Sequence, residues 1–126
     1  NNLNMFEEIH LAALISKGVE QEPTAIKAYD ALQMAATNGA KALGFDKDIG
    51  VIRAGMKADL ILIDMNKPHF YPRHNILANL VYSAQAADVD TVLVDGKVLM
   101  EKGEFKTIDF EEVVYHINKI AGRIFV

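Results

Sequence analysis

The stretch from Gly50 to Asp64 most constrains how this chain can fold. Its second half, Leu60–Ile63, is a short run of apolar residues that favour β-structure. Such a run, bounded by polar residues, is typical of a strand buried on both faces. Its first half carries Gly50 and Gly55 on either side of Val51-Ile52. Because glycine adopts positive φ without steric cost, we expect the backbone to turn at both glycines. The stretch therefore predicts a short strand at Val51-Ile52, a turn and a buried strand.

Two helices with capping signals are expected near the two ends of the chain. Asn4 and Glu7 stand three residues apart, as in a capping box, and an apolar stripe follows. We expect this first helix to end at Gly18. Asp109 and Glu112 repeat the capping pattern before a stripe of Val and Ile residues. A final helix is therefore predicted after Asp109.

A second helix is expected between the first helix and the Gly50–Asp64 stretch. Its apolar residues recur at helical spacing from about Thr24, and Asn38-Gly39 is a typical helix stop. Ala40–Leu43 is expected to form one further turn, closed by Gly44. These helices are rich in alanine, which suits close packing against a neighbouring layer.

The segments after residue 64 predict a loop, a short helix and a hairpin. Residues 66–74 contain two prolines and cannot form a central strand, so we expect an extended connection. Residues 75–84 fit both a short helix and a strand, and we favour the helix. Asp95-Gly96 joins two β-type runs, which is a strong hairpin signal. Gly103 is expected to mark a second turn.

Composition excludes several classes of protein and of site. The 13 basic and 17 acidic residues give a net charge of −4 and are dispersed, which argues against a nucleic-acid-binding surface. There is no cysteine, so no disulfide framework or thiolate metal site exists, and a reducing cytoplasm is the expected location. No apolar run approaches the length of a membrane span, and no signal-peptide pattern opens the chain.

The search for catalytic or metal-binding residues assigns none in this chain: no catalytic, no cofactor-binding and no metal-binding position. The histidines lack ligand spacing, so all four are interpreted as structural or solvated, with the loop residue His69 the least certain. They are His10, His69, His74 and His116. Glu7-Glu8 and Glu111-Glu112 fall in first helical turns, where their negative charges interact favourably with the positive end of the helix dipole. The remaining aspartates considered are read as solvated strand ends, namely Asp59, Asp64, Asp88 and Asp90.

Several stretches together resemble one known family. They are Asn1–Glu8, Ala35–Gly44, Gly50–Asp64, Asn79–Ala84 and Val92–Val98, in that order. This series resembles the C-terminal part of the amidohydrolase superfamily, in its aminohydrolase branch. Within that branch it is most similar to the methylthioadenosine/S-adenosylhomocysteine deaminases, which include proteins labelled chlorohydrolases. The resemblance covers essentially the whole chain, and no single motif carries it.

The resemblance implies an α/β fragment: the last helices of a (β/α)8 barrel, the C-terminal part of a small β-sandwich and a terminal helix. It assigns residues 1–47 to the barrel helices, 48–107 to the composite sandwich and 108–126 to the C-terminal helix, whose Ile and Val stripe would pack along the outside. The chain has 126 residues, whereas a complete barrel needs roughly 250. Because residue 1 is Asn and not Met, we expect an N-terminal barrel portion to be missing.

The resemblance also implies a function for the complete protein. It would be a metal-dependent hydrolase, with zinc as the expected metal, that deaminates an adenine-type substrate through a metal-bound hydroxide. The implied ligands, including an aspartate a few residues before Asn1-Asn2, lie outside this chain, so the fragment alone is expected to be inactive. Asn1 and Asn2 are interpreted as helix-entry residues, with lining the mouth of the pocket as the alternative.

A second hypothesis remains open: the segment acts alone as a structural or interaction module without catalysis. The two hypotheses differ in what covers the apolar helix faces, which a free-standing module should cover itself. For the first hypothesis the expected partners are the missing barrel portion, a small-molecule substrate and further copies in a homo-oligomer, with no nucleic acid and no membrane. Alone in solution, the chain is expected to be oligomeric or partly molten.

Overall fold

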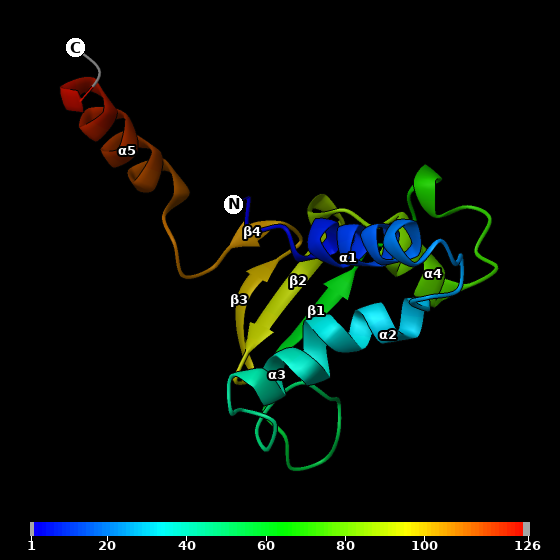
Figure 1. Ribbon diagram of the computed structural model, residues 1–126. Helices are drawn as coiled ribbons and strands as arrows, with labels where there is room; N and C mark the ends of the chain where they lie inside the picture. The colour runs from blue at the N-terminus through cyan, green and yellow to red at the C-terminus, as the bar shows by residue number, and fades with distance from the viewer. Residues whose placement is uncertain (1, 125–126) are drawn as a thin grey trace.

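The computed structural model describes residues 2–124 and places a group of helices beside one small sheet. In Figure 1 the helices α1 to α4 gather in front of and beside the strands, and α5 stands away from both. The bounds are α1 Met5–Glu20, α2 Ala28–Gln33, α3 Gly39–Ala42, α4 Ile76–Tyr82 and α5 Phe110–Ile124. The strands are β1 Leu60–Ile63, β2 Val89–Val94, β3 Lys97–Glu101 and β4 Glu104–Phe105. None of the described helices is long and apolar enough to cross a bilayer.

Helix α1 begins where the sequence predicts and ends later. The Asn4 side chain accepts a hydrogen bond from the Glu7 backbone N–H at 3.4 Å, which confirms the N-cap. The predicted end at Gly18 is wrong, because the helix continues to Glu20. It ends at Gln21, which takes a left-handed φ of 52° while its N–H bonds to the Lys17 carbonyl. A single glycine inside a helix costs only about 1 kcal/mol, and packing elsewhere in α1 offsets that cost.

The second helical region starts and stops later than predicted. Thr24 lies in a turn, where its hydroxyl donates to Glu22 at 2.7 Å, and α2 begins only after Lys27. The predicted stop at Asn38-Gly39 is wrong, because Gly39 has helical φ and the chain passes through a π-helical segment, Met34–Asn38, into α3. The turn closed by Gly44 is confirmed by its φ of 76°.

The Gly50–Asp64 stretch contains one strand and not two. Gly50 and Gly55 have φ of 96° and 89°, as predicted, but Val51-Ile52 forms no strand. The Gly50 backbone packs against α3 so closely that a Cβ there would lie 2.8 Å from the Ala40 Cβ. Strand β1 is confirmed, yet it is an edge strand, and the expected burial on both faces is wrong within this chain.

The sheet is antiparallel throughout, with strand order β1-β2-β3-β4. The predicted hairpin is confirmed: Asp95 and Gly96 both take positive φ, 50° and 76°, between β2 and β3. Leu93 faces Leu60 on one side and Val98 on the other, so β2 is a central strand. Gly103, with φ of 77°, turns the chain from β3 into β4, as expected.

The segment between β1 and β2 confirms the helix and corrects the loop. Residues 66–74 form no strand, as predicted, but the connection is not simply extended, because Pro68–Phe70 is a 3-10 turn that buries Phe70 completely. The preferred helix is present as α4, capped by the Asn75 side chain, which accepts from the Ala78 N–H at 3.0 Å. A second 3-10 turn, Ala86–Asp88, leads into β2.

The hydrophobic core within this chain is small. It is centred where α1, α2 and α4 meet, at Ile9, Ala13, Ala31 and Val81. Helix α4, which follows β1 in the chain, therefore packs against α1 and α2. Most large apolar side chains of the described residues are exposed, including Ile52, Leu62 and every Ile of α5. Much of the apolar surface that the sequence encodes is left uncovered among residues 2–124.

Candidate functional site

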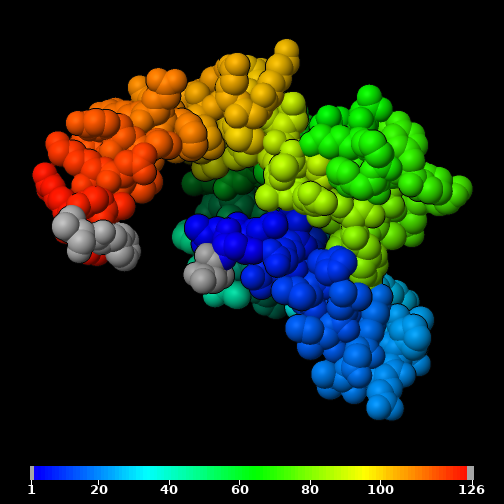
Figure 2. Space-filling model, turned by 90° about the horizontal axis from the view of Figure 1, so that it is seen from above, coloured from blue at the N-terminus to red at the C-terminus, as the bar shows by residue number. Residues whose placement is uncertain are grey.

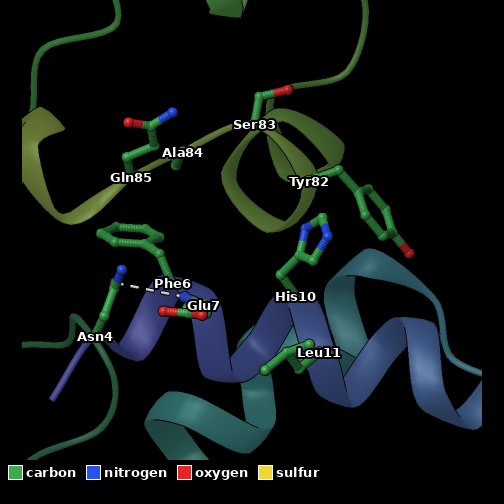
Figure 3. A pocket seen from close by; sticks show the side chains of 9 residues that line it. All are labelled: Asn4, Phe6, Glu7, His10, Leu11, Tyr82, Ser83, Ala84 and Gln85. Carbon is green, nitrogen blue, oxygen red and sulfur yellow. Dashed lines mark hydrogen bonds between the residues drawn. The ribbon is translucent and has the colours of Figure 1, made fainter. Parts of the chain in front are cut away.

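A pocket lies between the first turns of α1 and the C-terminal end of α4. Figure 3 shows its nine lining side chains, among which Glu7, His10, Ser83 and Gln85 are polar groups that could meet a ligand. The cavity measures about 330 Å³ and is open to solvent. The other lining residues are Asn4, Phe6, Leu11, Tyr82 and Ala84. Two of the lining side chains, His10 and Tyr82, already make contacts that hold α1 against α4.

His10 connects α1 to α4. Its Nδ1 lies 3.1 Å from the Val81 carbonyl oxygen, and its ring stands edge-on to Tyr82 with centroids 5.9 Å apart. Because a carbonyl only accepts, Nδ1 carries the proton in the neutral ring and Nε2 keeps the lone pair. Lys17 adds to the same contact, since its Nζ donates to the Tyr82 hydroxyl and lies 4.6 Å from the ring centroid. His10 therefore has a packing role in this chain.

Asp88 is the most buried charged side chain among the described residues, at 2% exposure. Its carboxylate accepts from Lys67 Nζ at 2.9 Å, from His69 Nε2 at 2.8 Å and from the Gln85 N–H at 2.8 Å. The sequence-based interpretation of Asp88 as a solvated strand end is wrong. A carboxylate that leaves water needs such donors, and here three surround it.

The electrostatics of Asp88 follow from these contacts. Burial alone would raise the pKa of its carboxyl, but the hydrogen bonds from Lys67, the Gln85 backbone and His69 outweigh burial. The pKa of Asp88 is therefore held below its usual range. Lys67 also donates to the Ala87 carbonyl at 2.8 Å, so the cluster ties the connection after β1 to the turn before β2.

Sequence reasoning missed Lys67 and singled out His69 only by its place in a loop. The partners of Asp88 lie 19 and 21 residues upstream of it, so no local spacing links them. The one available signal was the side-chain chemistry of the turn: Asp88 stands three residues after Gln85, at a position where an acid can cap a helical turn.

The other residues weighed from the sequence have local roles or lie on the surface. Asp59 accepts from the Asp95 N–H at 2.7 Å, Asp64 from the Asn66 N–H at 2.9 Å and Asp90 from the Thr91 hydroxyl at 2.8 Å. Glu7-Glu8 and Glu111-Glu112 occupy first helical turns, as expected. His74 is exposed, and His116 is exposed on α5 with Nε2 3.8 Å from Glu112.

Asn2 supports the entry into α1. Its side-chain oxygen accepts from the Asn4 N–H at 3.1 Å, and its amide donates to the Glu7 carboxylate. These contacts are those of a helix-entry residue. Asn1, which was given the same two interpretations, lies outside the described residues.

The side-chain donors among the described residues do not suit a metal ion. Within residues 2–124 no three His, Cys, Asp or Glu side chains converge on one point. The nearest approach to a ligand set is the Asp88–His69 pair, and its third member is Lys67. An ammonium group has no lone pair to offer and repels a cation.

A second hollow, larger than the first, is apolar and lies on the helix side of β1. It measures about 600 Å³ and is open. Its walls come from α1, the π-helical segment, α3, the Gly50 loop and β1, with Met5, Met34, Leu43, Ile52 and Ile61 among them. An open apolar surface of this size is typical of an interface.

Comparison with known proteins relates this chain to one family of enzymes. The profile of the Amidohydrolase family matches residues 1–99. A 5-methylthioadenosine/S-adenosylhomocysteine deaminase of Thermoanaerobacter pseudethanolicus is 56% identical over 124 residues, which are 98% of this chain and 29% of that protein. The chain thus spans less than a third of the length of the curated relatives that it matches.

Two solved structures have the same fold over this region. A zinc-bound adenosine deaminase from Xanthomonas campestris superposes with a TM-score of 0.92 at 34% identity, over 95% of this chain and 27% of that one. Atrazine chlorohydrolase TrzN from Arthrobacter aurescens, complexed with zinc, superposes with a TM-score of 0.83 at 26% identity, over 91% of this chain and 26% of that one. Sequence and structure agree: this chain belongs to the amidohydrolase family.

Proposed function

We propose that this chain is the C-terminal part of a longer hydrolase that releases ammonia from an adenine-type substrate, of the 5-methylthioadenosine or S-adenosylhomocysteine kind. The observation that carries the proposal is the 56% identity to a deaminase of that name over 98% of the chain. The zinc-bound adenosine deaminase, which superposes at 34% identity, supports the same class of reaction.

In this proposal the chain builds the scaffold and the remainder of the protein carries the chemistry. The helices α1 to α3 would close the wall of a barrel, and the sheet would form part of a β-sandwich. A divalent metal, with zinc favoured by the two zinc-bound relatives, would be held by residues outside this chain. The donor set described above supports that division, because its best carboxylate–imidazole pair is already neutralised by Lys67.

The alternative is a stand-alone interaction module. It would have to be stable with only six buried hydrophobic side chains among residues 2–124, four of them in one cluster. Such a core is small for a chain of 126 residues, in which about two thirds of the unfolded chain's surface should be buried. The exposed apolar surface therefore favours the fragment over the module. A cytoplasmic location and a homo-oligomeric state remain predictions for the longer protein.

A hybrid enzyme tests the proposal. The matched part of this chain, 98% of its length, replaces the corresponding residues of the Thermoanaerobacter deaminase, and ammonia release from 5-methylthioadenosine is measured with zinc present. We expect the hybrid to bind zinc and to keep activity within about tenfold of the parent, a change of about 1.4 kcal/mol in the barrier. The isolated chain, measured beside it, should bind no stoichiometric zinc and release no ammonia. A folded, zinc-loaded hybrid without activity would contradict the proposed function.

A further inference from the structure

The chain passes very close to its own helices at Gly50. A Cβ on Gly50 would lie 2.8 Å from the Ala40 Cβ and 3.3 Å from both the Ala36 carbonyl oxygen and the Thr37 Cα. The Gly50 φ of 96° also lies in the left-handed region, which glycine adopts without steric cost. Position 50 therefore favours glycine on two independent grounds, its backbone angle and its contact with these three residues, which is called the Gly50 contact below.

The helical surface that Gly50 touches is irregular. Ala36 and Thr37 belong to the π-helical segment Met34–Asn38, and Ala40 belongs to α3 directly after it. The extra residue of a π-helical turn rotates all that follows it by about 100°, because an α-helix has about 3.6 residues per turn. The π-helical register therefore decides which face of α3 meets Gly50. The Thr37 hydroxyl adds a hydrogen bond to the Gly50 carbonyl oxygen at 3.2 Å.

The loop of residues 48–57, which contains Gly50, is anchored at its base. The Lys57 N–H donates to the Asp48 carbonyl oxygen at 2.8 Å and closes the loop. Just before it, the Phe45 N–H donates to the Ala40 carbonyl oxygen at 2.8 Å, so the chain is still bonded to α3 shortly before the loop begins. A displacement at the Gly50 contact is therefore transmitted to the residues that leave the loop.

The residues that leave the loop are bonded to the turn between β2 and β3. The Gly96 N–H donates to the Ala58 carbonyl oxygen at 3.1 Å. The Asp95 N–H donates to the Asp59 carboxylate at 2.7 Å. A continuous series of contacts thus leads from the π-helical segment through the 48–57 loop to the β2–β3 turn, which lies far from Gly50 in the sequence.

The figures show the loop between the helices and the sheet. In Figure 1, α3 lies beside the end of the sheet at which β2 and β3 are joined, with the loop after α3 below it. In Figure 2, the green surface that follows α3 in the chain lies deeper than α1 and shows between α1 and the strands. The π-helical segment also packs on α1, α2 and α3, so the loop meets the helices at the segment that joins them.

We propose that the Gly50 contact is a conformational lock: it holds Met34–Asn38 in the π-helical register and, through the 48–57 loop, fixes the β2–β3 turn against the helices. A π-helical turn is rare, because the regular α-helix competes with it, and so it needs contacts that favour it. The Gly50 contact and the Thr37 hydrogen bond supply them. The lock is built from residues of this chain and does not depend on the reaction of a longer protein.

Gly55 provides a matched control for Gly50. Its φ is 89°, but a Cβ there would meet nothing within 4 Å. Gly55→Ala therefore adds strain at positive φ without a clash, whereas Gly50→Ala adds similar strain and also breaks the Gly50 contact. Gly55 is nearer than Gly50 to Ala58 and Asp59 in the sequence, so a disturbance that merely spreads along the chain would be larger for Gly55→Ala.

Amide hydrogen exchange of the hybrid described above measures both ends of the lock. We expect Gly50→Ala to speed exchange by about tenfold or more in residues 35–42 and also at Asp95 and Gly96. Gly55→Ala should leave the same amides within about threefold of the unsubstituted hybrid. Equal effects of the two variants, or an effect of Gly50→Ala that does not reach the β2–β3 turn, would overturn the lock. The measurement needs no catalytic activity, so an inactive hybrid would defeat the proposed function alone.

Milder changes keep the lock testable if Gly50→Ala prevents folding. Thr37→Val removes the hydroxyl that bonds Gly50 and should speed exchange at Asp95 and Gly96 by about threefold, whereas Thr37→Ser keeps a hydroxyl and should not. Ala40→Gly, added to Gly50→Ala, removes the nearest contact and should restore part of the lost protection. Equal exchange in the two Thr37 variants, or no recovery with Ala40→Gly, would overturn the lock.

Discussion

Helices α1 and α5 carry the same sequence signals, but α1 packs against α4 and α5 stays exposed. Both α1 and α5 have an acidic first turn, an N-cap and apolar residues at helical spacing. Helix α1 buries Ile9 and Ala13 against Val81 of α4, whereas α5 buries no side chain. A local signal decides that a helix forms, and the presence of a second surface decides whether its stripe becomes a core.

The largest effect should come from removing a phenylalanine in the packed region. Phe70 is fully buried, and its carbonyl oxygen accepts from the Asn79 side chain at 2.8 Å. Phe70→Ala should lower the free energy of unfolding by about 3–5 kcal/mol, measured by urea unfolding of the hybrid. In the isolated chain the same change should abolish any cooperative transition, whereas Phe110→Ala should leave it within about 0.5 kcal/mol. If Phe70→Ala and Phe110→Ala lowered the stability of the isolated chain by similar amounts, the contrast between the packed region and α5 would be wrong.

The Asp88 cluster gives an intermediate effect that depends on pH. Because the pKa of Asp88 is lowered in the folded state, its contribution is present above the unfolded pKa, about 3.9, and is lost as pH falls through the folded value. Asp88→Asn should destabilise the hybrid by about 1–3 kcal/mol at pH 7, and the difference from wild type should shrink steadily below about pH 4. Asp46→Asn, at an exposed loop position, is the matched control. A difference that does not change between pH 7 and pH 3 would exclude the charge as its cause.

The smallest effect compares the two N-caps. Asn4→Ala removes the cap of a packed helix and should lower the stability of the hybrid by about 1 kcal/mol. Asp109→Ala removes the cap of α5. In the isolated chain it should reduce helix content by circular dichroism without moving the midpoint of any unfolding transition, because the described part of α5 buries no side chain. A shift of that midpoint by Asp109→Ala would show that α5 is coupled to the body.

Features specified by neighbouring residues could be predicted from the sequence. The caps at Asn4 and Asp109 and the Asp95-Gly96 turn depend on side chains and φ angles within four residues, and the structure contains all three. Helix ends were harder. The sequence predicts helix ends at Gly18 and Gly39, but both lie within helical segments, because packing and continued hydrogen bonding outweigh the cost of a glycine.

Features specified by distant residues could not be predicted. The sequence predicts a solvated Asp88 because no neighbouring residue indicates its contacts with Lys67 and His69. These two residues lie 21 and 19 positions earlier in the chain. Strand β1 was expected to be buried on both faces from its composition, and within this chain it is an edge. The apolar composition of β1 and of α5 is matched by no burial among the described residues.

Amide hydrogen exchange of the isolated chain and the hybrid tests this account most directly. We expect the amides of α1 around Ile9 and Ala13 to be protected in both proteins, and those of α5 from Val113 to Ile120 to be protected only in the hybrid, by at least a hundredfold, or about 2.7 kcal/mol. Equal exchange of α5 in the two proteins would contradict the claim that the remainder of a longer amidohydrolase completes this chain.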